Sequence, residues 1–187
     1  MYSARLISSF GAISVAVQKV GSQIESISWM AADGFSASIN AFTSQNYGAK
    51  NYNRVHKGYK TGILVVSLWG LFTTCILIFL PGPIFSCFIH ETTILPYGID
   101  YLVILGYSQL FMCIEIATQG AFNGLGKTFP PSIVSIVFTS ARIPMAVILS
   151  QFLGVNGVWW AISISSIIKG IVLVTWFILY SRRRLVV

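Results

Sequence analysis

Long apolar stretches, separated by short polar, glycine-rich or proline-rich connections, dominate this chain. Five stretches are long enough to form membrane-crossing helices: residues 13–46, 55–85, 97–125, 130–152 and 156–181. A helix needs about 20 apolar residues to cross the hydrocarbon core of a bilayer. Ser, Gln, Glu, Asp and Asn interrupt the first stretch throughout, so it is less apolar than the other four. The pattern predicts a helix bundle that crosses the membrane about five times.

The composition also indicates a membrane protein. Of the 187 residues, 55% are hydrophobic and only 9% are charged, whereas about 25% of residues in a soluble domain are charged. The mean hydropathy is +0.77. We therefore expect an all-α, polytopic integral membrane protein whose helix bundle spans residues 13–181. Residues 1–12 resemble the end of a truncated preceding helix, and residues 182–187 a basic cytoplasmic tail.

Lysine and arginine occupy alternate connections. The connection after the first stretch holds Lys50, Arg54, Lys57 and Lys60, the connection after the third holds Lys127, and the tail holds three arginines. Cytoplasmic loops carry the excess of Lys and Arg, so we expect these ends and the C-terminus to lie on the cytoplasmic side of the plasma membrane. The net charge of +7 fits contact with anionic lipid heads better than a nucleic-acid partner.

Residues 121–128 fit the loose phosphate-binding pattern of a small residue, four others and Gly-Lys-Thr. Such a loop needs a buried strand before it and a helix that begins at the Lys-Thr pair. Phe129, Pro130 and Pro131 follow instead, and a proline pushes the residue before it away from helical geometry. We therefore predict a turn here and no bound nucleotide. The histidine and cysteine spacings indicate no metal site, and no cofactor is expected.

Polar residues recur on one face of the first stretch. At about 100° per residue, seven of them fall within an arc of roughly 100°: Ser22, Glu25, Ser26, Asp33, Ser36, Asn40 and Ser44. Polar groups in hydrocarbon are costly, so this face is expected against other helices or a water-filled cavity. Either the stripe supplies hydrogen bonds between helices, or Glu25, Asp33 and Asn40 line a path for substrate or coupling ion.

The third stretch carries Glu115, Gln119 and Asn123 at intervals of four residues, so they share a face. Gly120 and Gly124 lie beside them, in a pattern that lets a neighbouring helix approach closely. Glu115 is roughly two helical turns from the cytoplasmic end. We interpret Glu115 as a cavity-lining residue that accepts a coupling proton; the alternative is a buried structural partner for Arg142.

Two cations are expected at membrane depth, Arg142 in the fourth stretch and Lys169 in the fifth. Ionisable residues inside a spanning helix are rare and usually pair or face a polar cavity. Each cation could pair with Glu25, Asp33 or Glu115, or could select the charge of a substrate. Pairing is the simpler interpretation.

Three short motifs resemble one family of transporters. The run AFTSQNYGAKNYNRVHKGYKTG, residues 41–62, resembles a segment in which Gln-Asn-x-Gly-Ala leads from a spanning helix into a basic cytoplasmic connection. The matching residues are Gln45, Asn46, Gly48 and Ala49. GAFNGLGKTFPP, residues 120–131 with Gly124 and Gly126, is similar to the family's turn after its tenth helix, and GVNGVWWA, residues 154–161, to the start of its twelfth. By these motifs the chain is identified as a member of the multidrug and toxic compound extrusion (MATE) family.

The resemblance implies a fold and an activity. By this resemblance we expect the architecture of MATE transporters, in which two six-helix bundles, or lobes, are related by a pseudo-two-fold axis. The transport path lies between or within the lobes. MATE transporters export organic, often cationic drugs in exchange for H⁺ or Na⁺. This chain would correspond to helices eight to twelve and the end of helix seven, a C-terminal lobe expected to be inactive without its N-terminal lobe in cis or in trans. A carboxylate on the tenth helix of some relatives would lie about one turn from Glu115.

Two other functions fit the same residues. A flippase for lipid-linked oligosaccharides or polysaccharides would use a cationic groove. Arg142 and Lys169 facing a cavity would favour that function, and pairing of both with acids would count against it. A non-transporting half-bundle could instead modulate a full transporter. An enzyme is not expected, because no nucleophile, base and orienting group occur together.

Overall fold

The computed structural model describes residues 7, 11–89, 91 and 94–184. The segment predicted as the end of a preceding helix, residues 1–12, lies almost entirely outside the described residues. The described part of the chain forms six helices: α2 (Ala12–Gly48), α3 (Tyr52–Phe79), α4 (Pro81–Ser86), α5 (Leu95–Gly124), α6 (Phe129–Leu153) and α7 (Val155–Arg184). The predicted all-α bundle is confirmed.

The helix boundaries follow the predicted stretches closely, with two differences. The stretch 55–85 is divided, because α3 ends at Phe79 and the short helix α4 begins at Pro81. Proline suits the first turn of a helix, where its missing N–H would have no partner, and prolines also lie in the first turns of α5 and α6. At the other end of the chain, α7 continues through Arg184, so the predicted basic tail is helical over its first residues.

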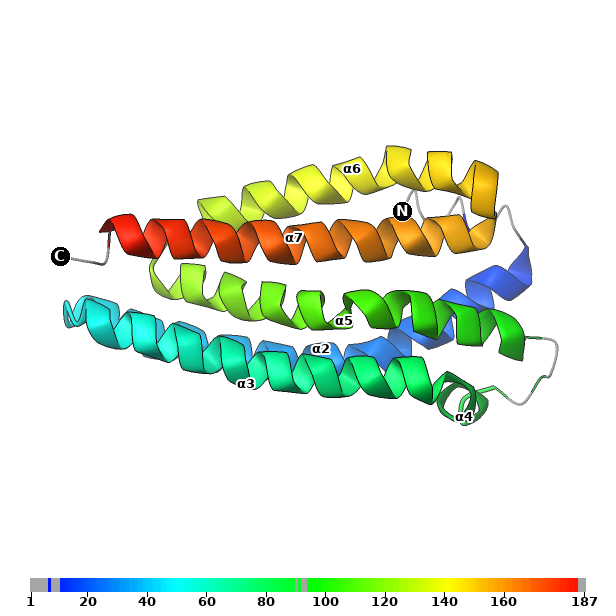
Figure 1. Ribbon diagram of the computed structural model, residues 1–187, viewed down its shortest axis with the longest axis horizontal. Coiled ribbons are helices and arrows are strands. Elements are labelled where there is room, and N and C mark those ends of the chain that lie inside the picture. Colours follow the sequence, from blue (N-terminus) through cyan, green and yellow to red (C-terminus); the bar gives the residue numbers. More distant parts are fainter. Residues whose placement is uncertain (1–6, 8–10, 90, 92–93, 185–187) are drawn as a thin grey trace.

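Four of the described helices are long and apolar enough to cross a membrane: α3, α5, α6 and α7. Helix α2 has 37 residues and is longer than any of them, but polar residues interrupt it and it does not meet the same standard of hydropathy. It nevertheless runs beside α3 and α5 along the bundle (Figure 1).

Helix α5 occupies the centre of the bundle (Figure 1). It packs along α2, α3 and α7, whereas α6 packs on α7 and barely touches α5. Within its most apolar segment, α5 buries 56% of its residues inside the chain, against 11% for α6. Polar side chains on α5 can therefore be surrounded by protein, while most of α6 remains on the surface of the bundle.

Glycines permit the close contact between α2 and α5. Helices in lipid gain little from the hydrophobic effect when they associate, so close packing of small residues contributes instead. A Cβ atom on Gly120 would overlap the carbonyl oxygen of Ser36, and one on Gly124 would lie 2.6 Å from the carbonyl oxygen of Asn40. The predicted close approach at this glycine pair is confirmed. Gly124 belongs to this helix contact, as the last residue of α5, and not to the turn that follows.

The Gly-Lys-Thr sequence lies in the predicted turn between α5 and α6. Gly126 has φ 69°, a conformation that glycine adopts without steric cost. The backbone N–H of Lys127 donates to the carbonyl of Phe122 at 3.0 Å, which closes the turn. Helix α6 begins at Phe129, and its two prolines lie in the first turn.

The Gln-Asn-x-Gly-Ala motif ends α2. Gln45, Asn46 and Gly48 belong to the last turn of the helix, and Ala49 follows it. The side-chain amide of Asn46 donates to the carbonyl of Phe42 at 2.7 Å. The motif therefore forms a helix end, from which the chain turns into α3.

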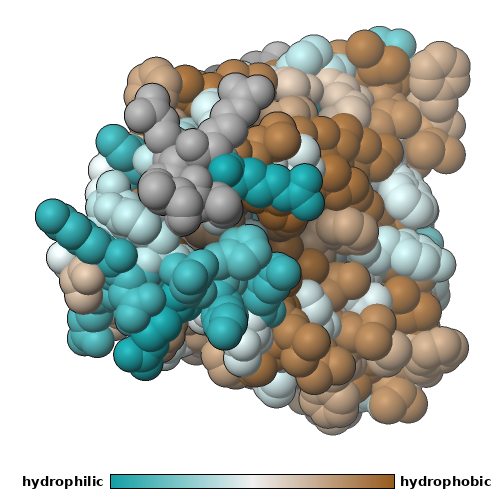
Figure 2. All heavy atoms as spheres, turned by 60° about the vertical axis from the view of Figure 1, so that its left-hand side comes forward, coloured by the Kyte–Doolittle hydropathy of each residue, from teal (hydrophilic) through white to brown (hydrophobic). Residues whose placement is uncertain are grey.

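The connections rich in Lys and Arg lie at one end of the molecule. The α2–α3 turn, the α5–α6 turn and the end of α7 are together in Figure 1, and α4 and the α6–α7 connection are at the opposite end. Figure 2 shows hydrophilic residues gathered over the first of these ends and hydrophobic residues covering the wall. This division is typical of a membrane protein, with a polar cap outside the hydrocarbon.

Candidate functional site

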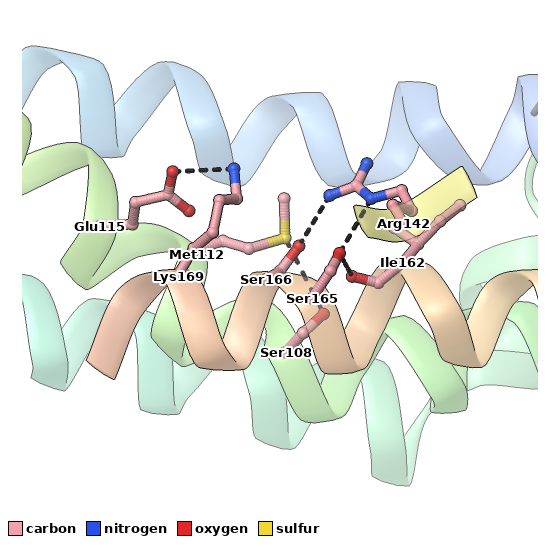
Figure 3. A network of polar contacts seen from close by, with 8 residues as sticks. All are labelled: Ser108, Met112, Glu115, Arg142, Ile162, Ser165, Ser166 and Lys169. Atoms are coloured by element: carbon pink, nitrogen blue, oxygen red, sulfur yellow. Dashed lines mark hydrogen bonds and ion pairs between the residues drawn. The ribbon is translucent and has the colours of Figure 1, made fainter. Parts of the chain in front are cut away.

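Glu115 and Lys169 form an ion pair between α5 and α7 (Figure 3). The Nζ atom of Lys169 lies 2.9 Å from Oε1 of Glu115, and the two side chains are only 12% and 14% exposed respectively. Of the partners left open for Lys169 by the sequence, the structure selects Glu115. A charge-assisted hydrogen bond of this kind is stronger in a low-dielectric environment than in water.

A glycine contact explains why these two side chains meet. A Cβ atom on Gly170 would lie 2.7 Å from the carbonyl oxygen of Phe111, so α7 approaches the backbone of α5 at this point. Lys169 precedes Gly170, and Glu115 follows Phe111 by one helical turn. The close approach of the two backbones therefore brings the ammonium group within reach of the carboxylate.

Arg142 joins α6 to α7 beside this ion pair. Its Nε donates to Oγ of Ser165 at 2.9 Å and its Nη2 donates to Oγ of Ser166 at 3.3 Å. Arg142 also interacts electrostatically with Glu115. The two serines were not predicted from the sequence, although they precede Lys169 by four and three residues and therefore share its helix face.

We refer to Glu115, Arg142 and Lys169 as the charged cluster. The three residues come from three different helices, and each lies well inside its helix. When all are ionised, the charged cluster carries one more positive than negative charge. A proton or a cation that binds the carboxylate would weaken its attraction to Lys169, and the second positive charge could attract an anion.

Gln119 and Asn123 continue from Glu115 along α5 and are exposed. The side chain of Glu115 itself is mostly buried and lies against Lys169. The shared face predicted for these three residues is therefore buried at one end and open at the other. Exposed amides within a spanning helix need water or polar protein groups around them.

The polar stripe on α2 is divided between different surroundings. Glu25 is 2% exposed, and the hydroxyl of Tyr101 on α5 donates to its Oε2 at 3.3 Å. The hydroxyl of Ser36 donates to the carbonyl of Ile116 at 2.9 Å. Asp33 is exposed and Asn40 half-buried. Part of the stripe therefore bonds α2 to α5, as the helix-bonding interpretation expects.

The structure does not join this stripe to the charged cluster. Within the described residues, no ion pair links Glu25 or Asp33 to Arg142 or Lys169. A cavity of about 260 Å³ lies between α2 and α3, and Glu25 lines it together with mainly apolar side chains. The α2 carboxylates and the charged cluster are therefore separate groups.

Gln109 is a buried polar residue that was not predicted as a site. Its side chain is fully buried on α5, and among the described residues neither its Oε1 nor its Nε2 has a hydrogen-bond partner. Its position in an otherwise apolar stretch was a signal that the sequence contained. Among the described residues, no group of three or more His, Cys, Asp or Glu side chains could hold a metal ion.

Two curated relatives match most of this chain. The "Probable multidrug resistance protein NorM" of Thermotoga maritima is 28% identical over 152 residues, which are 80% of this chain and 33% of the relative. The protein of the same name from Mesorhizobium japonicum is 24% identical over 187 residues, 93% of this chain and 39% of the relative. The chain thus spans well under half the length of these relatives.

Solved transporter structures have the same fold. The Vibrio cholerae MATE transporter VcmN in its bent form superposes with a TM-score of 0.90 at 21% identity, covering 98% of this chain and 42% of that one. An inward-facing multidrug resistance MATE family transporter of the MOP superfamily gives a TM-score of 0.81 at 22% identity, covering 92% of this chain and 40% of the other.

A protein-family model completes the assignment. The MatE model matches residues 1–148, which is most of the chain. The match covers the first two of the three sequence motifs and agrees with the fold of the solved transporters. The chain belongs to the MatE family of multi-pass membrane transporters, the multidrug and toxic compound extrusion proteins, which are not enzymes.

Proposed function

We propose that this chain forms the C-terminal lobe of an exporter that carries organic, often cationic drugs across the plasma membrane in exchange for H⁺ or Na⁺. The charged cluster is the observation that supports this proposal. It brings one carboxylate and two cations from three helices together inside the membrane-spanning part of the bundle. Ionisable groups at that depth are costly and usually serve transport.

Glu115 has the central role in the proposed mechanism. It is the one carboxylate of the charged cluster, and its Oε1 is held by Lys169. A proton and an organic cation would compete for the carboxylate oxygen atoms of Glu115, and either would weaken its ion pair with Lys169. That competition would couple the inward flow of the ion to the outward flow of the drug.

The exposed polar residues support a second lobe beside this one. Asp33 on α2 and Gln119 and Asn123 on α5 are exposed. Contact between such polar groups and lipid hydrocarbon costs free energy. We propose that they face the transport path or an N-terminal lobe, in cis or in trans. By the same proposal, the chain transports nothing without that lobe.

The test uses everted membrane vesicles from cells that produce the chain alone or together with the N-terminal lobe of the Thermotoga maritima relative. Co-purification first establishes that the two lobes assemble. We expect a pH or Na⁺ gradient to drive ethidium uptake only with both lobes, and Glu115→Gln to abolish it. Glu91→Gln is the matched control, because Glu91 is an exposed carboxylate outside the helices. If the Glu115→Gln variant took up ethidium along the gradient as fast as the unmodified chain, the proposed role of Glu115 would be refuted.

The excess positive charge of the charged cluster favours a second candidate function. Lys169 is paired with an acid, but Arg142 is bonded to two neutral hydroxyl groups. A guanidinium group can bind a phosphate through two hydrogen bonds, so a flippase for lipid-linked oligosaccharides could use Arg142. In that case Arg142→Gln, and not Glu115→Gln, would abolish transfer of a fluorescent pyrophosphate-linked lipid across vesicle membranes.

A further inference from the structure

A groove lies between α3 and α7 at the Lys- and Arg-rich end of the molecule. Its volume is about 470 Å³, and its lining includes His56, Tyr59, Lys60, Ile63, Ile178 and Arg182. A second cavity of about 410 Å³ shares Lys60 and Ile63 with it and continues along α3, past Leu64, Leu68 and Leu71, where Leu110 of α5 lines its other side. We call these two adjoining cavities the α3–α7 groove. It has cations at one end and apolar side chains along the rest of its length.

The floor of the groove is firmly packed. The ring of Tyr59 lies 4.0 Å from the ring of Phe177, measured between centroids. The hydroxyl of Tyr59 is hydrogen-bonded to that of Thr118 on α5 at 3.1 Å. At the polar end, Nδ1 of His56 lies 3.2 Å from Oγ of Ser181, so α3 and α7 are bonded directly there. The two walls are therefore held at a defined separation.

The cations at the mouth of the groove have no acidic partner near them in the chain. Lys60 and Arg182 are both exposed. The sequence has no Asp or Glu in residues 34–90 or 116–187, which include all of α3, α6 and α7. The five Asp and Glu side chains therefore leave the basic side chains at this end uncompensated, and an anion would find a positive potential there.

The surface beside the groove is apolar. Leu64 is 60% exposed, Leu68 61% and Leu179 52%, and all three lie on the two helices that form the groove. Large aliphatic side chains so exposed on spanning helices are typical of a surface that contacts lipid chains. This surface differs from the part of α5 that exposes Gln119 and Asn123.

We propose that the α3–α7 groove binds one anionic phospholipid of the surrounding membrane. Its phosphate would lie between Lys60 and Arg182, and one acyl chain would follow Ile63 towards Leu68 and Leu71. Basic pockets between spanning helices on the cytoplasmic side suit anionic headgroups. A zwitterionic lipid fits less well, because its own cation would lie beside two positive side chains. This inference does not depend on which compound the transporter carries.

The experiment measures phosphatidylglycerol retained by the purified chain in native mass spectrometry, after delipidation and titration with the lipid. Each surface cation contributes about fivefold to the affinity for an anionic lipid, so we expect Lys60→Gln/Arg182→Gln to weaken binding by roughly twenty-five-fold. Lys50→Gln/Lys57→Gln is the matched control, because these exposed lysines lie at the same end but do not line the groove. The control should retain the lipid nearly as well as the unmodified chain.

Two further measurements separate a lipid site from a simple anion site. Inorganic phosphate at millimolar concentration should not displace phosphatidylglycerol, and phosphatidylcholine should bind much more weakly. Val174→Trp keeps every charge but fills the groove, and it should also reduce lipid retention. Equal losses in both double variants, displacement by phosphate, or full retention by Val174→Trp would each overturn the proposal.

Discussion

The Nζ atom of Lys169 lies 2.9 Å from Oε1 of Glu115, and both side chains are largely removed from solvent. In such surroundings, the free energy of each buried charge depends on the presence of its partner. If one partner is removed, the other remains buried without compensation, which typically costs about 3–5 kcal/mol. If both are removed, neither member of this ion pair is left behind without the other, so the two substitutions should not be additive.

We therefore predict that Glu115→Gln and Lys169→Gln each lower the free energy of unfolding by about 3 kcal/mol. The double variant should lose clearly less than the sum. Thermal unfolding of the purified chain in detergent, arranged as a double-mutant cycle, measures this coupling. Glu91→Gln should change stability little, because this carboxylate is exposed. Additive losses in the cycle would show that the ion pair contributes nothing.

The helices of this chain could be predicted closely, and the ion pair could not. A backbone in lipid must satisfy its own hydrogen bonds, so a long apolar run such as residues 97–125 becomes a helix, here Leu95–Gly124. The partner of Lys169 depends instead on which helix approaches α7. That choice rests on Gly170 meeting the backbone of Phe111, a contact between distant parts of the chain that no local pattern reveals.

Polar stripes were also only partly predictable. The seven residues on α2 share a face by helical geometry, but a bundle surrounds a helix unevenly along its length. Glu25 consequently meets Tyr101, while Asp33 is exposed eight residues later. The spacing predicted which residues share a face of the helix and could not predict what lies opposite each turn.

The contact between α2 and α5 should be sensitive to small increases in side-chain size. We predict that Gly120→Ala lowers the free energy of unfolding by about 1–3 kcal/mol, because its Cβ would overlap backbone atoms of Ser36. The measurement is again thermal unfolding in detergent. Gly34→Ala is the control: a Cβ at Gly34 meets no atom within 4 Å, and alanine is the better helix former. A loss at Gly34 as large as that at Gly120 would contradict this explanation.

We expect that a lysine at position 142 cannot reproduce the hydrogen bonds of Arg142. The guanidinium group donates to Ser165 and Ser166 from two different nitrogen atoms, and an ammonium group lacks that planar, forked geometry. We predict that Arg142→Lys destabilises the contact between α6 and α7 by about 1–2 kcal/mol although the charge is kept. Crosslinking of cysteines placed across that contact, together with thermal unfolding, measures the effect. A variant as stable as the unmodified chain would indicate that charge alone is required.

Tyr101 should stabilise the fold, because its hydroxyl donates a hydrogen bond to a buried carboxyl group. Glu25 is 2% exposed, and its Oε2 accepts from the hydroxyl of Tyr101 at 3.3 Å. Tyr101→Phe removes that donor and should cost about 1–3 kcal/mol of stability. If Glu25 is first changed to Gln, the same tyrosine substitution should cost less, since no group that can carry a charge then remains to be compensated. Equal costs in the two backgrounds would refute this coupling.

The end of the molecule that carries Lys and Arg should face the cytoplasm. The α2–α3 turn, the α5–α6 turn and the end of α7 lie together at that end (Figure 1), and positive residues remain preferentially on the cytoplasmic side during membrane insertion.

Cysteine labelling measures this orientation. After replacement of Cys75, Cys87 and Cys113 by serine, a single cysteine is introduced by Lys50→Cys or by Glu91→Cys. In intact cells, a membrane-impermeant maleimide should label the Glu91→Cys protein and should reach the Lys50→Cys protein only after the membrane is permeabilised. The reverse pattern would invert the topology and would move the α3–α7 groove to the other leaflet. Labelling therefore tests the orientation and one premise of the lipid site in the same experiment.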